Sequence, residues 1–101
     1  MVKRKVVWSE KAIDDLNYYC GEISRESFSA AKKVRSVILA TAKELSNFPY
    51  IYQVEEYFLG NTGDVRRFFC WSYRVVYQVQ EKKVVILSVI HTRMNPEKIS
   101  S

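Results

Sequence analysis

The sequence contains few of the residues that mark disulfide-stabilised, metal-binding or membrane-spanning proteins. It has two cysteines, one histidine, three glycines and two prolines among 101 residues. Cys20 and Cys70 form no Cys-x-x-Cys pair and each has apolar neighbours, so we expect buried thiols in a reducing cytoplasm. One histidine and no ligand spacing argue against a zinc site, and we expect neither a metal nor a cofactor.

Long apolar runs are also missing. No stretch approaches about 18 consecutive apolar residues, and the basic start MVKRKVVWSE lacks the apolar segment of a signal peptide. We therefore expect a cytoplasmic protein with no membrane partner. Apolar residues (48%) and charged residues (27%) occur in globular proportions, and the length predicts a single domain over residues 1–101. The net charge of +5 is compatible with a nucleic-acid partner and equally with a basic domain that binds no polyanion.

The strongest structural signal is the stretch VRRFFCWSYRVVYQVQEKKVVILSVIHTR, residues 65–93. Residues 73–80 and 84–92 are rich in β-branched and aromatic side chains and contain no glycine or proline, as strands do. The short polar connection between them predicts an antiparallel hairpin. A third strand, residues 65–71, is expected to precede it. The meander carries the candidate binding residues Arg66, Arg67, Arg74, His91 and Arg93.

The register of the hairpin decides which of these side chains meet. If Gln80 pairs with Lys83, Arg74 lies opposite Val89, and side chains then alternate with a period of two. This register predicts that Arg74, His91 and Arg93 share one face at one end of the sheet. One residue of the Arg66/Arg67 pair is expected beside them, on the face away from the helices.

The first half of the chain predicts a strand and two helices. Residues 3–8 alternate as a strand, and Ser9 stands where a helix N-cap belongs. A helical apolar stripe follows as far as Ile23, and the polar residues 24–27 predict the turn of a helical hairpin.

The second helix is expected over residues 28–48, because Pro49 restricts the residue before it. Residues 50–64 are the least regular part, although part of 54–59 leaves room for a short strand. The predicted fold is α+β in the order β-α-α-β-β-β. A helical hairpin packs on one face of a mainly antiparallel four-stranded sheet.

The residues expected at the open sheet face are chemically suited to phosphodiesters. Guanidinium groups bind phosphate oxygens through paired donors, His91 could transfer a proton, and Glu55 could act as a base. A structural explanation fits the same residue types. In it, Arg74 and Arg93 pair with carboxylates such as Glu55 or Glu56, and the histidine is satisfied within the fold.

Several motifs resemble the RelE/ParE superfamily of bacterial toxins. These are WSEKAIDDL at the first strand–helix junction, RRF, YRVVYQV and the ending VVILSVIHTR, so the resemblance runs from Val6 to Arg93. It implies the β-α-α-β-β-β fold and the toxin of a type II toxin–antitoxin, or plasmid-stabilisation, module. It also implies a cognate antitoxin and a toxin–antitoxin hetero-oligomer.

Two activities are known in this superfamily. RelE-like members cut messenger RNA on the ribosome without a metal, and ParE-like members inhibit DNA gyrase and are not nucleases. By resemblance, Arg74 matches the arginine that RelE-like enzymes place on the scissile phosphate, Arg67 lies near a basic position, and Arg93 lies near the C-terminal arginine. Val65 stands where RelE has its lysine base, so Glu55 and His91 would have to serve as base and acid.

The ending ILSVIHTR looks more like the ParE branch. A ParE-like gyrase inhibitor, which is not an enzyme, is therefore the first hypothesis. A RelE-like ribosome-dependent endoribonuclease is the alternative. A non-toxic basic module that binds nucleic acid is the third.

Overall fold

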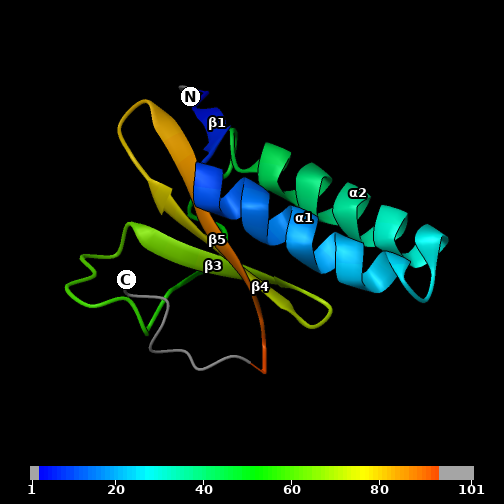
Figure 1. The fold of residues 1–101 in the computed structure, drawn as a ribbon. Coiled ribbons are helices and arrows are strands. Elements are labelled where there is room, and N and C mark those ends of the chain that lie inside the picture. The colour runs from blue at the N-terminus through cyan, green and yellow to red at the C-terminus, as the bar shows by residue number, and fades with distance from the viewer. Residues whose placement is uncertain (1–2, 94–101) are drawn as a thin grey trace.

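The computed structural model describes residues 3–93 as two helices on one face of a five-stranded sheet (Figure 1). The α+β fold predicted from the sequence is confirmed. The elements follow in this order: β1 (Lys5–Trp8), α1 (Glu10–Ser24), α2 (Phe28–Glu44), β2 (Gln53–Val54), β3 (Val65–Cys70), β4 (Tyr73–Val79) and β5 (Lys83–His91).

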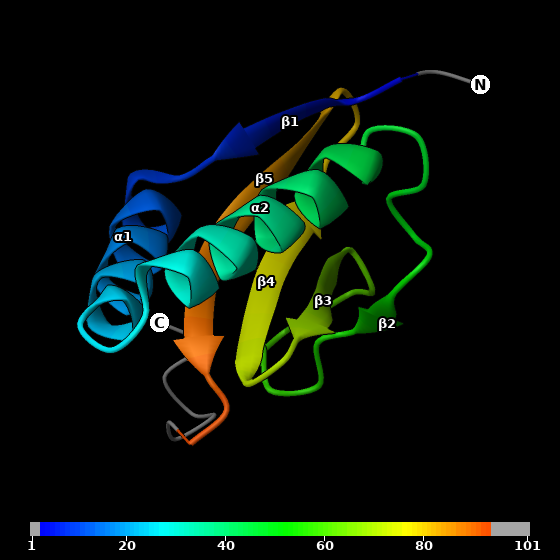
Figure 2. The same ribbon diagram turned by 90° about the vertical axis from the view of Figure 1, so that its right-hand side faces the viewer.

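The sheet has the strand order β1-β5-β4-β3-β2, and Figure 2 shows α2 crossing its face. Strand β1 runs parallel to β5, and the other neighbours are antiparallel. The sheet has one strand more than the four predicted, because the two residues of β2 pair with Arg66 and Arg67 of β3. The short strand lies at the start of the region where the sequence left room for one.

Both helices begin with a serine cap, at Ser9 as predicted and at Ser27 in the predicted turn. The side chain of Ser9 accepts a hydrogen bond from the Ala12 N–H at 3.0 Å, and Ser27 accepts one from Ala30 at 3.1 Å. These caps satisfy backbone donors that the first turn cannot pair within the helix. Helix α2 ends at Glu44, a turn earlier than Pro49 alone predicts.

The face of the sheet beneath the helices holds the larger core. Ile38, Ala42 and Leu45 from the second helical segment are fully buried against the strands. Tyr77 of β4 is buried among them, and its hydroxyl donates to the Pro49 carbonyl at 2.8 Å. Burial raises the pKa of Tyr77 to about 12. This core therefore fixes the end of the helical hairpin onto the centre of the sheet.

Helix α1 satisfies the edge of β5 where β1 ends. Strand β1 pairs only as far as Ile86. Beyond it, the Val89 N–H donates to Asp15 at 3.0 Å, and the His91 N–H donates to the Tyr19 hydroxyl at 3.3 Å. Side chains of the helix thus replace strand partners along this half of β5, which leaves less of the edge open to another strand.

The predicted register is correct near the β4–β5 turn and wrong further along. Val79 pairs with Val84 as expected, but an extra residue, Leu87, bulges from β5. Arg74 consequently lies opposite Ile90 rather than Val89. Because a shift of one residue reverses the facing of a strand, Arg74 and His91 do not share a face, contrary to the prediction.

Two expectations based on scarce residue types can be compared with the structure, one on the cysteines and one on membrane spans. Cys20 and Cys70 are buried free thiols, as predicted, and burial raises the pKa of both. Within residues 3–93, neither helix is long and apolar enough to span a bilayer.

Candidate functional site

The face of the sheet away from the helices carries the candidate arginines. Its apolar part is small, with Val65, Val76 and Ile90 buried against Phe58 and Leu87. The segment that contains β2 and residues 55–64 covers this cluster. Beside it, alternate residues of the meander place Arg67 and Arg74 on the same face, because side chains of a strand alternate.

Arg74 forms a closed ion pair with Glu55. Its Nη1 donates to Oε1 at 2.7 Å and to Oε2 at 2.9 Å, and the Glu55 side chain is 0% exposed. Oε1 also accepts from the Tyr57 backbone N–H at 3.2 Å. The guanidinium lies 5.1 Å from the centre of the Tyr57 ring and 5.0 Å from that of Phe69. Glu55 therefore balances the charge of Arg74, and the carboxylate and the two rings hold its side chain in position.

Arg67 is held in a similar way but is less completely paired. It lies 4.8 Å from the Phe69 ring, donates to Gln53 at 3.1 Å and approaches Glu56 at 3.7 Å. Its Nε is buried and has no hydrogen-bond partner among the described residues. The acidic residues expected to reach this edge, Glu55 and Glu56, do so.

Arg66, unlike Arg67, bonds to backbone carbonyls of the segment between α2 and β3. Its guanidinium donates to the carbonyl of Tyr52 at 2.7 Å and lies over the Tyr50 ring at 4.9 Å. A further bond to the Gly63 carbonyl at 3.0 Å ties both ends of the irregular segment together. Arg66 is thus a clamp for the chain between α2 and β3.

His91 lies on the helical side of the sheet. Its ring is 5.3 Å from Tyr73 and 6.3 Å from Tyr19. Its Nδ1 accepts a hydrogen bond from the Arg93 backbone N–H at 3.1 Å. An open cavity of about 550 Å³ is lined by Tyr18, Tyr19, His91 and Arg93. The structure brings Arg67, Arg74 and Glu55 together, and it separates them from the histidine.

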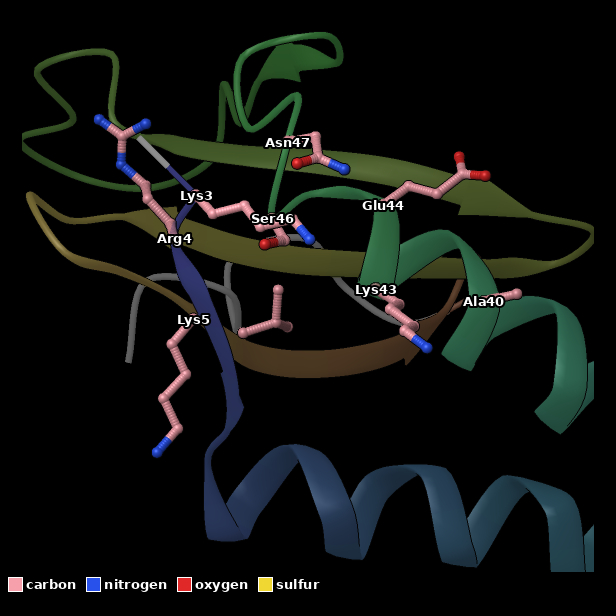
Figure 3. Close-up of a pocket in the computed structure, with 9 residues that line it drawn as sticks. Lys3, Arg4, Lys5, Ala40, Lys43, Glu44, Ser46 and Asn47 are labelled. Carbon is pink, nitrogen blue, oxygen red and sulfur yellow. The ribbon is translucent and has the colours of Figure 1, made fainter. Parts of the chain in front are cut away.

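A second cavity lies between β1 and the end of α2 (Figure 3). It has a volume of about 560 Å³ and is lined by Lys3, Lys5 and Lys43. Figure 3 shows these three side chains leading in different directions and not to one point. Lysines are favourable near the negative end of a helix dipole, which accounts for them without a ligand. Across residues 3–93, no group of histidine, cysteine and carboxylate side chains could hold a metal ion.

Exposed aromatic residues are a feature that the sequence analysis missed. Tyr57, Phe69 and Trp71 each expose a large part of their side chains near the end of the β3–β4 hairpin. A signal was present in the strand, because alternation turns Phe69 away from the core when Phe68 faces it. The density of aromatic residues in this stretch concealed that difference.

Comparisons with known proteins agree with this architecture. A family model described as the ParE toxin of the type II toxin–antitoxin system parDE matches residues 6–96. The chain belongs to this toxin family. No curated protein matches it.

Three solved structures share the fold. The chromosomal ParDE system of P. aeruginosa aligns with a TM-score of 0.70 and 18% identity, covering 90% of this chain and 98% of the other. The toxin–antitoxin complex RelBE2 of Mycobacterium tuberculosis gives 0.58 and 21% over 90% and 93%. The YoeB dimer of Staphylococcus aureus gives 0.51 and 17% over 85% and 93%. At these identities the likeness concerns the fold.

Proposed function

We propose that this toxin arrests growth by binding and inhibiting DNA gyrase, as ParE-like members do. The observation that carries the proposal is the closed pair of Glu55 and Arg74. Metal-free RNA cleavage needs a base beside the 2′-hydroxyl, a cation on the phosphate and an acid for the leaving oxygen. A toxin that acts by binding a protein needs none of the three.

The residues available for those catalytic roles are poorly placed for them. Glu55, the candidate base, is fully buried and accepts hydrogen bonds on both oxygens. Arg74, the candidate phosphate cation, already faces that carboxylate at 2.7 Å. His91, the candidate acid, belongs to the opposite side of the sheet, against Tyr19 and Tyr73. This arrangement favours binding over cleavage.

We also propose that a cognate antitoxin holds the toxin inactive in a hetero-oligomer. The relatives from P. aeruginosa and Mycobacterium tuberculosis are described as a toxin–antitoxin system and complex. In this chain, the helical hairpin presents exposed apolar side chains that such a partner would cover. They are Ile13, Tyr18, Phe28, Val37 and Leu39. If the pair is carried by a plasmid, it would stabilise that plasmid.

The test compares two purified systems. Increasing amounts of the toxin are added to DNA gyrase with relaxed plasmid, and separately to ribosomes translating a defined message. We expect loss of supercoiling and an intact message. The His91→Ala variant should inhibit gyrase within about threefold of the wild type, because the imidazole lies at the helical side of the sheet.

The opposite result is equally specific. Cleavage of ribosome-bound message at preferred codons, lost in both His91→Ala and Glu55→Gln, would overturn the proposal in favour of a RelE-like nuclease. The Glu55→Gln change keeps the size and the acceptor oxygen of the side chain but removes its basicity. Binding to free nucleic acid, without gyrase inhibition or growth arrest, would instead indicate a basic binding module.

A further inference from the structure

The turn between β3 and β4 places a tryptophan in a strained backbone conformation. Cys70 pairs with Tyr73, so Trp71 and Ser72 form a two-residue loop. Trp71 has φ of 50°, and no other non-glycine residue between 3 and 93 has a positive φ. Hairpin loops of this length favour Gly, Asn or Asp at such a position, because a bulky side chain is strained there. Strain kept at an exposed position points to a role for the side chain.

The Trp71 side chain contributes little to the fold. It is 58% exposed, while its neighbours Cys70 and Tyr73 are buried in the core. The cation of Lys33 on α2 lies 5.9 Å from its ring, a contact that is weak between exposed groups. Figure 1 shows the turn at the end of the hairpin, below the helices.

The aromatic side chains beside this turn are held in place. Phe69 is 49% exposed, and the guanidinium groups of Arg67 and Arg74 lie 4.8 and 5.0 Å from its ring centre. Arg74 is itself fixed by Glu55, whose side chain is fully buried. An exposed aromatic surface that is ordered before binding loses little conformational freedom on association. Trp, Tyr and Arg are also the residues that dominate protein interfaces.

We propose that Phe69 and Trp71 form the contact through which the toxin docks onto DNA gyrase, an inference that rests on the proposed function. Trp71, on a projecting turn, fits an apolar pocket of a folded protein. Lys33 and the incompletely paired Arg67 suit carboxylates at the rim of that pocket.

The local charges favour a protein over a nucleic acid. A single strand requires a positively charged track for its phosphates. Here Arg74 is paired with Glu55 at 2.7 Å, and Arg67 faces Glu56 at 3.7 Å. Three cations lie near the β3–β4 turn: Lys33, Arg67 and Arg74. The two arginines have carboxylates beside them. The surface is apolar with little net charge, as protein contacts commonly are.

The test uses Trp71→Gly, which removes the ring and relieves the backbone strain. We expect this variant to unfold at the same or a higher temperature than the wild type and to inhibit gyrase at least about 30-fold less well. Trp71→Phe should keep most of the inhibition, and Phe69→Ser should lose about tenfold. Phe48→Ala is the matched control, because Phe48 is 55% exposed in the segment after α2, and its inhibition should stay unchanged.

Each other outcome overturns a different statement. If wild-type toxin inhibits gyrase and Trp71→Gly inhibits it equally, the docking surface is wrong and the proposed function stands. If the wild type arrests growth without inhibiting gyrase, the proposed function is wrong, and the docking of this surface onto gyrase is overturned with it. Loss of antitoxin binding, or of binding to a single-stranded oligonucleotide, with gyrase inhibition retained would assign the surface to that partner and refute the inference. Inactive wild type would overturn both.

Discussion

The two faces of the sheet are stabilised by different means. The face beneath the helices is a continuous apolar core, in which Ile38, Leu45 and Tyr77 are fully buried. The opposite face has a much smaller apolar cluster and relies on a buried ion pair between Glu55 and Arg74. Apolar packing is made of many non-directional contacts, whereas a buried charge depends on one specific partner.

Side-chain hydrogen bonds extend this difference to the irregular segment that covers the open face. Asn61 donates to the carbonyl of Glu55 at 2.8 Å and to that of Val65 at 2.9 Å, and it accepts from the Gly63 N–H at 2.9 Å. Gly63 has φ of 103°, a conformation that favours glycine. Asn61 thus orders the irregular segment between β2 and β3.

The largest expected effect comes from breaking the ion pair on one side. Arg74→Met leaves the carboxylate of Glu55 buried without its partner, and we expect a loss of about 3 kcal/mol in the free energy of unfolding. Adding Glu55→Leu removes the stranded charge and should restore most of that loss. Urea unfolding of the wild type, both single variants and the double variant measures the coupling.

Arg93→Met provides the control for this cycle, because Arg93 is exposed at the end of β5. It should change stability by less than about 0.5 kcal/mol. A double variant as unstable as Arg74→Met alone would show that the open face depends on the shape of these side chains rather than on their charges.

Most of the fold was predictable because its signals are local. The cap at Ser9, the helical spacing of apolar residues and the β-rich meander each act over a few residues. The bulge at Leu87 was not predictable in this way. The run that contains it, residues 84–90, is apolar except for Ser88, so no alternation marks an extra residue, and a shift of register changes the polarity of each face little.

The candidate site was harder to predict for the same kind of reason. Arginine on an open strand has one sequence signature, whether it awaits a phosphate or pairs with a carboxylate. The two possibilities differ in the position of Glu55, which a long irregular segment carries to Arg74 from 19 residues away in the chain. Composition revealed which groups were present, and only the backbone path decided which of them meet.

The next prediction concerns the face beneath the helices, whose stability should fall at high pH because of Tyr77. Burial raises the pKa of Tyr77 to about 12 from its ordinary value of 10.0. Above pH 10 the unfolded chain releases this proton while the folded chain keeps it, so stability falls as pH rises and its contribution is lost by about pH 12. The free energy of unfolding is expected to fall by about 2–3 kcal/mol. Denaturant unfolding at a series of pH values between 9 and 12 measures this loss.

Tyr77→Phe separates this titration from the hydrogen bond to Pro49. The variant should be about 1 kcal/mol less stable at neutral pH, since the Pro49 carbonyl loses its donor. Its stability should also fall less steeply above pH 10 than that of the wild type. Equal slopes would assign the alkaline loss to other groups, such as Tyr73, whose pKa burial also raises.

The smallest expected effect tests how the helical hairpin is joined to the sheet. Ser9 and Ser27 are matched N-caps, but the Ser9 hydroxyl also donates to the Leu87 carbonyl of β5 at 3.1 Å. Replacement of Ser27 by Ala removes a cap alone and should cost about 1 kcal/mol. Ser9→Ala removes the cap and leaves the bulged strand without a donor, so we expect about 2 kcal/mol. Thermal unfolding of the two variants gives the difference directly. Equal losses would mean that water replaces the serine at Leu87, and that the bulge is stabilised from the open face instead.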